Sequence, residues 1–158
     1  MPAAERTRYQ QLIDAWLAGE SEPPPVASLV GIRLTGWADG VVRMELDAEP
    51  RHHNPMGGLH GGILCDLADL AMGCAFAVQL ADDEKFGTLQ LTASFLRPVS
   101  AGRLVATARL LHRTRGGAGH LEAEIADAEG RVVARFTSTC LAVRSAPPAA
   151  PAGDSGHR

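Results

Sequence analysis

A chain of 158 residues is long enough for one domain with a sizeable core. Hydrophobic residues make up 46% of it and aromatic residues only 4%, which predicts an interior packed from Ala, Val and Leu. The formal net charge of −3 gives no general attraction to nucleic acid or to an anionic membrane, so an anionic ligand would need a local basic patch.

The N-terminus and the cysteines indicate a cytoplasmic protein. The chain starts Met1-Pro2-Ala3-Ala4-Glu5-Arg6 with no apolar stretch behind the charges, so no signal peptide is expected. No uninterrupted apolar run of about 18–20 residues predicts a membrane span. Cys65 and Cys74 lie roughly 13 Å apart along one predicted helix, too far for a disulfide. With Cys140 they are expected to be reduced.

The first part of the chain predicts a helix and a hairpin. Residues 5–18 have helical spacing of apolar residues, and we expect them to pack on the domain surface or on a partner subunit. Pro23-Pro24-Pro25 breaks this helix. A short helical turn after Val26 leads into two alternating segments joined at Ala38-Asp39-Gly40, a hairpin signal, and the polar stretch 47–55 follows.

A central helix is expected from about Gly61 to about Leu80. It is apolar almost all round, so it should be buried on most sides by a larger element. Gly73 in its middle costs ~1 kcal/mol relative to Ala, which indicates close approach by a neighbouring backbone.

The rest of the chain predicts long strands. After a charged loop at 82–85, β-rich segments cover 88–96, 104–112, 120–127 and 132–143. A long buried helix and a strongly curved antiparallel sheet form an α+β architecture whose exposed sheet edge should pair with a second copy. We divide the chain into an N-terminal helix and Pro-rich linker (1–25), the main domain (26–144) and a disordered tail (145–158).

The start of the central helix carries groups suited to carbonyl chemistry. The segment Asn54 to Gly62 combines a loop amide with a helix N-terminus, whose unpaired N–H groups stabilise negative charge. Two carboxylates, Asp66 and Asp69, follow on the apolar helix, where an ionised group is costly without a reason.

These residues resemble the hotdog-fold acyl-CoA thioesterases. The branch is the one with the phenylacetate-pathway (PaaI-like) thioesterase, the Arthrobacter-type 4-hydroxybenzoyl-CoA thioesterase and the mammalian medium/long-chain member. The resemblance lies in His53-Asn54-Pro55, Gly58-Leu59-His60-Gly61-Gly62, Leu67-Ala68-Asp69 and Ser94-Phe95-Leu96-Arg97-Pro98-Val99. It covers roughly residues 26–144 and implies the hotdog fold and hydrolysis of an aryl- or medium-chain acyl-CoA to the acid and CoA.

The resemblance implies catalytic roles for four residues. Asn54 would contact the thioester or the attacking water, and the backbone N–H of Gly61 would polarise the carbonyl. Asp69 would be nucleophile or general base, preferred over Asp66 because it matches the family's offset, and Thr88 would orient the water or the carboxylate. Each also has a structural interpretation: a turn Asn, a packing Gly, an Asp that is exposed at a subunit interface or paired with Arg, and an ordinary strand Thr.

The resemblance also implies the substrate contacts and the assembly. His60 and Gly62 would shape the carbonyl site, although a structural loop His is an equal alternative. CoA phosphates would meet Arg97 and the basic loop Arg113, Arg115 and Gly116, unless these are ordinary surface arginines or Arg97 pairs across a dimer. In relatives one subunit gives the Asn and the helix end and its neighbour gives the carboxylate, so a homodimer or homotetramer with shared sites is expected. The acyl pocket would be lined by the partner's loop and by Leu70, Met72, Gly73 and Phe76.

Other classes fit less well. No His pair has zinc-ligand spacing, and neither a Walker loop nor a Gly-x-Ser-x-Gly elbow occurs, so no metal or cofactor is expected. The arginines have no aromatic platform for single-stranded nucleic acid. Hotdog dehydratases and hydratases typically use a His base on the helix, which here offers Asp69 and no His. A hotdog protein that binds acyl-CoA without turnover stays open.

Overall fold

The computed structural model describes residues 5–144, so the predicted tail at 145–158 lies outside the described residues. The helices are α1 (Arg8–Ala18), α2 (Pro25–Val30) and α3 (Gly61–Ala77), with a 3-10 turn η1 at Pro50–His52. The strands are β1 (Arg33–Ala38), β2 (Val41–Ala48), β3 (Glu84–Phe95), β4 (Gly102–Arg113), β5 (Ala118–Asp127) and β6 (Val132–Arg144).

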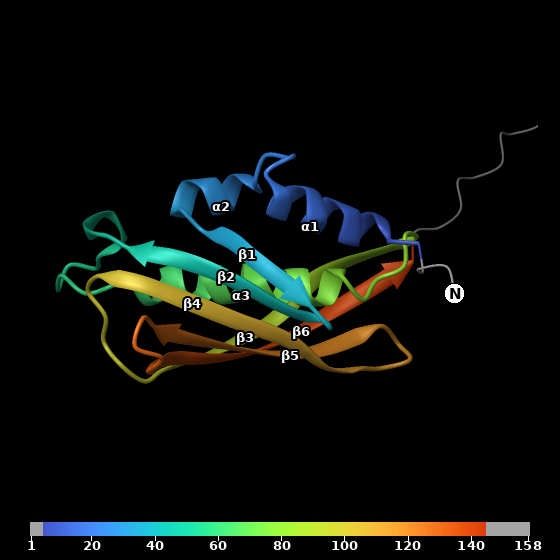
Figure 1. The fold of residues 1–158 in the computed structure, drawn as a ribbon. Coiled ribbons are helices and arrows are strands. Elements are labelled where there is room, and N and C mark those ends of the chain that lie inside the picture. Colours follow the sequence, from blue (N-terminus) through green and yellow to red (C-terminus); the bar gives the residue numbers. More distant parts are fainter. Residues whose placement is uncertain (1–4, 145–158) are drawn as a thin grey trace, which may run out of the picture.

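All six strands form one antiparallel sheet in the order β1-β2-β4-β5-β6-β3. Figure 1 shows the sheet curving along α3, with α1 and α2 lying beside β1. Strand β3 follows α3 in sequence but pairs with β6, so it forms the edge opposite β1. This arrangement confirms the predicted α+β hotdog fold.

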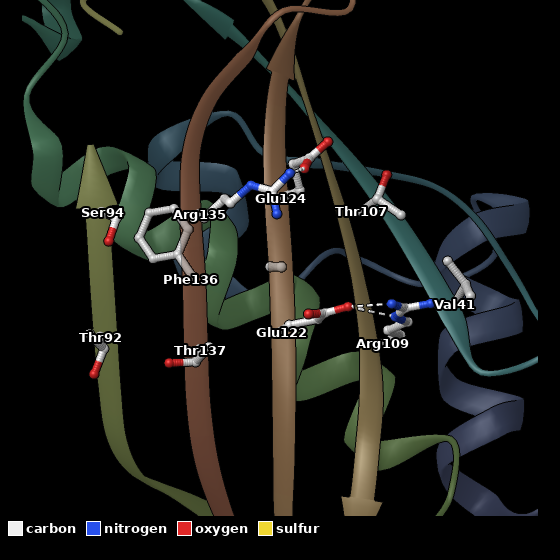
Figure 2. Close-up of a pocket in the computed structure, with 11 residues that line it drawn as sticks. Val41, Thr92, Ser94, Thr107, Arg109, Glu122, Glu124, Arg135, Phe136 and Thr137 are labelled. Carbon is white, nitrogen blue, oxygen red and sulfur yellow. Dashed lines mark hydrogen bonds and ion pairs between the residues drawn. The ribbon is translucent and has the colours of Figure 1, made fainter. Parts of the chain in front are cut away.

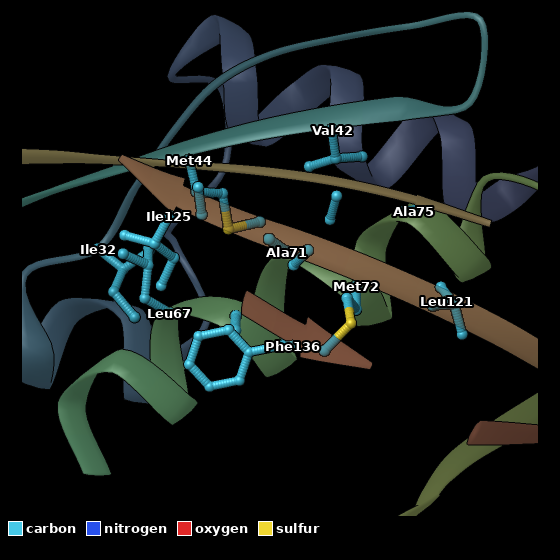
Figure 3. Packing of buried hydrophobic residues seen from close by; sticks show 14 of the residues in the cluster. Ile32, Val42, Met44, Leu67, Ala71, Met72, Ala75, Leu121, Ile125 and Phe136 are labelled. Carbon is cyan, nitrogen blue, oxygen red and sulfur yellow. The ribbon is translucent and has the colours of Figure 1, made fainter. Parts of the chain in front are cut away.

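The core lies between α3 and the inner face of the sheet. Leu67, Ala71, Met72 and Ala75 of α3 are fully buried. Figure 3 shows them packed among side chains from early and late strands, including Val42, Met44, Leu121, Ile125 and Phe136. Alanines on α3 let the sheet approach closely, which explains how an aliphatic chain with few aromatics fills this core.

The hairpin prediction is confirmed and two boundary predictions are corrected. Asp39 and Gly40 both have positive φ, 51° and 75°, as a tight hairpin between β1 and β2 requires. Helix α3 ends at Ala77, three residues before Leu80, because Val78 and Leu80 are buried in the turn that follows and so extend the apolar pattern. Strand β3 begins at Glu84, inside the segment predicted to be a charged loop.

Helix α1 packs on the same chain, against β1 and α3. Thr7 and Gln10 form a capping box at its start, and Gly19 in the left-handed region ends it. Ile13 is its only buried residue. Among the helices of residues 5–144, none is long and apolar enough to cross a membrane.

Candidate active site

The N-terminus of α3 leaves one backbone donor open. His60 is the N-cap: its Nδ1 accepts a hydrogen bond from Gly62 N at 2.9 Å, and its carbonyl accepts from Ile63 N at 3.0 Å. Gly61 N has no acceptor within residues 5–144. Its N–H therefore carries the positive end of the helix dipole into the space in front of the helix. Of the three residues, Gly61 is placed to receive an oxyanion, while His60 and Gly62 are engaged in the cap.

Asn54 lies beside this donor with its amide nitrogen unused. Its Oδ1 accepts from the backbone N–H of Met56 at 2.9 Å and of Gly58 at 3.3 Å, which fixes the loop. The Nδ2 group has no acceptor in the described part of the chain. Asn54 therefore has both the turn role and a free donor. A cavity of about 490 Å³ is lined by Asn54 and Gly61, and by Phe95 and Arg97 from the β3 end.

Asp69 and Thr88 form the second polar pair. The Thr88 hydroxyl donates to Asp69 Oδ1 at 3.0 Å, joining the middle of α3 to β3. Behind it, the Cys140 thiol of β6 lies 3.7 Å from the same hydroxyl. Asp69 is half-buried, and its second oxygen accepts no hydrogen bond from residues 5–144. The predicted proximity of a hydroxyl to the carboxylate is thus present.

Asp66 sits one helical turn earlier and differs in environment. It is exposed and makes no hydrogen bond to the rest of the described chain. Partial burial, and then repulsion from Asp69, raise the pKa of its carboxyl, while His60 lowers it. Asp66 thus has no hydroxyl to orient it, in contrast to Asp69.

Within one chain the two polar pairs are separate. Asp69 follows Gly61 by eight residues on the same helix, which is about 12 Å along its axis. A base must reach the proton it removes at about 3 Å, directly or through one water. Within one chain, Asp69 is therefore out of direct reach of a group that is hydrogen-bonded to the Gly61 N–H.

The predicted arginines lie at opposite ends of the helix. Arg97 lines the cavity near Gly61, and no carboxylate of residues 5–144 pairs with its guanidinium. Arg113, Arg115 and Gly116 line a depression of about 690 Å³ near the C-terminal end of α3. There Arg113 forms an ion pair with the buried Glu84 and donates to Gln79 O, so it holds the fold together. Arg115 has no side-chain partner in the described chain.

The structure corrects the predicted acyl pocket. Met72 and Phe76 are fully buried in the core, because they point from α3 toward the sheet. Leu70 and Gly73 instead face a groove whose other wall includes Tyr9, Leu12 and Trp16 of α1. Residues of α1 were not predicted to line a pocket beside α3. The apolar residues on one face of α1 are the sequence signal that indicates such a role.

The outer face of the sheet holds a further depression of about 650 Å³, shown in Figure 2. Its charged side chains are paired across strands: Arg109 with Glu122 at 2.6 Å and Arg135 with Glu124 at 2.6 Å. None of the predicted catalytic residues lines it. No group of three His, Cys, Asp or Glu side chains within residues 5–144 is arranged to hold a metal ion.

Known proteins share this fold and part of this sequence. The proofreading thioesterase EntH of Klebsiella pneumoniae is 33% identical over 106 residues, which are 67% of this chain and 77% of that protein. The 1,4-dihydroxy-2-naphthoyl-CoA hydrolase of Listeria monocytogenes is 31% identical over 83 residues, 52% of this chain and 68% of that protein.

Solved structures of other proteins have the same fold as this chain. A phenylacetic acid degradation-related protein of Ralstonia eutropha JMP134 superposes with a TM-score of 0.74 at 31% identity, over 82% of this chain and 98% of that one. The PaaI protein of E. coli has a TM-score of 0.72 over 84% of this chain and 94% of its own, and at 23% identity it supports the fold alone.

Fold and relatives together define a hotdog-fold thioesterase, a thioester hydrolase. Within this class, the chain belongs to the family described as a domain of unknown function (DUF4442), which matches residues 18–142. The family match includes α3 and all six strands except the last residues of β6, and it includes only the last residue of α1.

Proposed function

We propose that this protein hydrolyses acyl-CoA thioesters at sites shared between two subunits: R–CO–S–CoA and water give R–COOH and CoA–SH. The hydrogen bond from Thr88 to Asp69 is the observation that carries the proposal. A strand hydroxyl that donates to one carboxylate oxygen fixes the other oxygen toward the substrate, as a base or nucleophile requires.

The helix end supplies the electrophilic half of the reaction. The Gly61 N–H would donate to the thioester oxygen as negative charge develops on it, and Asn54 Nδ2 would donate to the scissile group or the water. As a general base, Asp69 would take a proton from water while the oxygen attacks the carbonyl carbon. The tetrahedral intermediate then expels the CoA thiolate, which is protonated. As a nucleophile, Asp69 would form an anhydride that water opens, with the same net products.

A second subunit would bring the halves together. Strand β3 is an edge strand of twelve residues, and most of its side chains are exposed on both faces, including Leu89 at 65%. Such an edge is suited to pairing with another strand. Two copies joined along β3 by a two-fold axis would place the helix start of one near the middle of α3 in the other. A homodimer, or a tetramer of two such dimers, would then hold two complete sites per pair.

The CoA end should meet the arginines whose side chains are unpaired. Arg97 beside the Gly61 cavity and Arg115 at the other end of α3 are the candidates, with Gly116 leaving space for a phosphate. The name of the Listeria relative gives a CoA thioester as that protein's substrate, which supports this choice.

A thiol-release assay tests the proposal. Aryl-, short-chain and medium-chain acyl-CoAs are offered to the wild type, Asp69→Ala and Asp69→Asn, with Asp66→Asn as the matched control on the same helix. We expect turnover in the wild type and in Asp66→Asn, and a loss of about 100-fold or more in kcat for both Asp69 variants. Turnover that survives in Asp69→Asn, or is lost equally in Asp66→Asn, contradicts the assigned base. Binding of acyl-CoA without any turnover would mean a non-catalytic binder.

A further inference from the structure

An apolar groove of about 550 Å³ lies between the N-terminal segment and the body of the domain. One wall is the apolar face of α1 with Pro23-Pro24-Pro25, and the other is a flank of α3 with Phe86 of β3. Its volume is in the usual range for sites that bind small molecules.

The groove reaches the proposed catalytic carboxylate. Asp69 and Thr88, which are hydrogen-bonded to each other, both line it. A ligand in the groove would therefore touch the group proposed to start hydrolysis. This continuity distinguishes the groove from the depression on the outer face of the sheet, which none of these residues lines.

We propose that this groove holds the acyl group of the substrate, and that α1 with the proline linker selects uncharged, apolar acyl groups. The inference rests on the proposed function and names its substrate class. The family match begins at residue 18 and so includes only the last residue of α1.

The charges of the groove fit an uncharged acyl group. No Lys or Arg lines it, and its carboxylates are Asp69 and the exposed Glu22. Burial raises the pKa of Cys74 to about 12, so this thiol adds no charge to the wall. An acyl group with a second carboxylate would find no cation and would be repelled.

Hydrogen bonds at the start and in the middle of α1 hold it against the domain. Gln10 Nε2 donates to Val78 O at 2.9 Å, Tyr9 Oη donates to Glu84 O at 2.9 Å, and Trp37 Nε1 donates to Asp14 Oδ1 at 2.8 Å. Leu12, which lies between these anchors, is 62% exposed, and Trp16, which lies beyond Asp14, is only half-buried. The helix is thus fixed in place while part of its apolar face is left uncovered, as a ligand site requires.

Gly73 keeps the floor of the groove open. A Cβ added there would lie 3.8 Å from the Phe86 ring, an ordinary van der Waals contact. Ala should therefore fit at this position, whereas a Leu side chain would extend into the groove. Gly73→Leu fills the groove, Gly73→Ala is its matched control, and Trp16→Ala enlarges it from the other wall.

The test measures kcat/KM for acetyl-, hexanoyl-, decanoyl-, phenylacetyl- and succinyl-CoA. We expect Gly73→Leu to lose about tenfold or more on decanoyl- and phenylacetyl-CoA, with acetyl-CoA changed by less than about threefold. Gly73→Ala should lose much less than Gly73→Leu on the same two substrates, because it adds only a methyl group. Trp16→Ala should shift preference toward larger acyl groups, and succinyl-CoA should be poor throughout. Trp16→Ala gives a readout even if Gly73→Leu fails to fold.

Three outcomes overturn the inference. If Gly73→Leu and Trp16→Ala change all substrates equally or none, while the wild type is active and Asp69→Ala is not, the acyl group binds elsewhere and the proposed function stands. If either variant changes the oligomer mass in solution, a second copy of the chain occupies the groove. If the wild type hydrolyses no acyl-CoA, the proposed function fails and the inference fails with it.

Discussion

At the scale of single residues, the proposed role of Gly61 can be tested most directly, because it uses only a backbone N–H. It is the first residue of α3, a position where Pro is well tolerated, and His60 before it has φ −67° and ψ 131°, which suits a following Pro. Any side chain there meets the Phe95 ring, 2.9 Å from an added Cβ, but Phe95 is 54% exposed and has room to turn.

Gly61→Pro therefore removes the N–H and preserves the helix, whereas Gly61→Ala adds a comparable contact and keeps the donor. We expect kcat to fall about 100-fold or more for Gly61→Pro and only several-fold for Gly61→Ala. The measurement is steady-state thiol release, with circular dichroism to check the helix. Equal losses in the two variants would mean that Phe95 packing, and not the N–H, is responsible.

Thr88 is a positioning residue that acts through Asp69. Thr88→Val keeps the shape of the side chain and removes the hydroxyl, so Asp69 loses its orienting donor. We expect kcat to fall about tenfold with KM nearly unchanged, while Thr92→Val, an exposed change on the same strand, has no effect. A purely structural role would instead lower the thermal midpoint and leave kcat of the folded enzyme intact.

At the scale of elements, the Arg113–Glu84 pair joins the end of β4 to the start of β3. Glu84 also accepts from Ala81 N at 2.9 Å, and Arg113 lies over the Phe76 ring, 5.7 Å from its centroid. The Ala81 N–H, and then the Arg113 guanidinium, lower the pKa of the Glu84 carboxyl. Because this pKa is lower in the folded state, the pair stabilises above the unfolded value of 4.5, and the contribution is lost as pH falls through the folded pKa.

Arg113→Ala should therefore destabilise the protein by about 2 kcal/mol near pH 7, since it leaves a largely buried carboxylate unpaired. This corresponds to a thermal midpoint lower by roughly 4–8 °C, and the difference should shrink below pH 4.5. Arg115→Ala is the control: we expect unchanged stability and a raised KM for acyl-CoA. Thermal melts across pH measure the stability of both variants. If Arg113→Ala keeps full stability and has a raised KM for acyl-CoA, then Arg113 binds CoA and does not stabilise the fold.

Some boundaries of these elements could be predicted from the sequence and others could not. The Asp39-Gly40 hairpin and the start of α3 at Gly61 could be predicted, because turn chemistry and the helix N-terminus are local signals. The start of β3 could not, because Glu84 is acidic yet buried against Arg113, a partner 29 residues away. Met72 and Phe76 were misplaced for a related reason: on a helix apolar all round, periodicity does not say which flank faces the sheet and which faces α1.

At the scale of the whole molecule, the proposed shared sites require two chains to pair along β3. Leu89→Lys places a charge on this edge, which opposes strand pairing. We expect a smaller mass by light scattering and a loss of about tenfold or more in activity, because each chain alone holds only half-sites. Leu111→Lys on the inner strand β4 is the control, since Leu111 is 52% exposed and lies off the edge. A fully active Leu89→Lys monomer would place the whole site within one chain.

Mixing two inactive variants tests the shared site most directly. Asp69→Ala and Asn54→Ala homodimers are each defective, but a mixed dimer holds one site with Asn54 from one subunit and Asp69 from the other. After unfolding and refolding an equal mixture, we expect about one quarter of wild-type activity to return, since half of the dimers are mixed and each has one intact site out of two. A mixture no more active than its two components, with mixed dimers shown to form, would contradict the shared site.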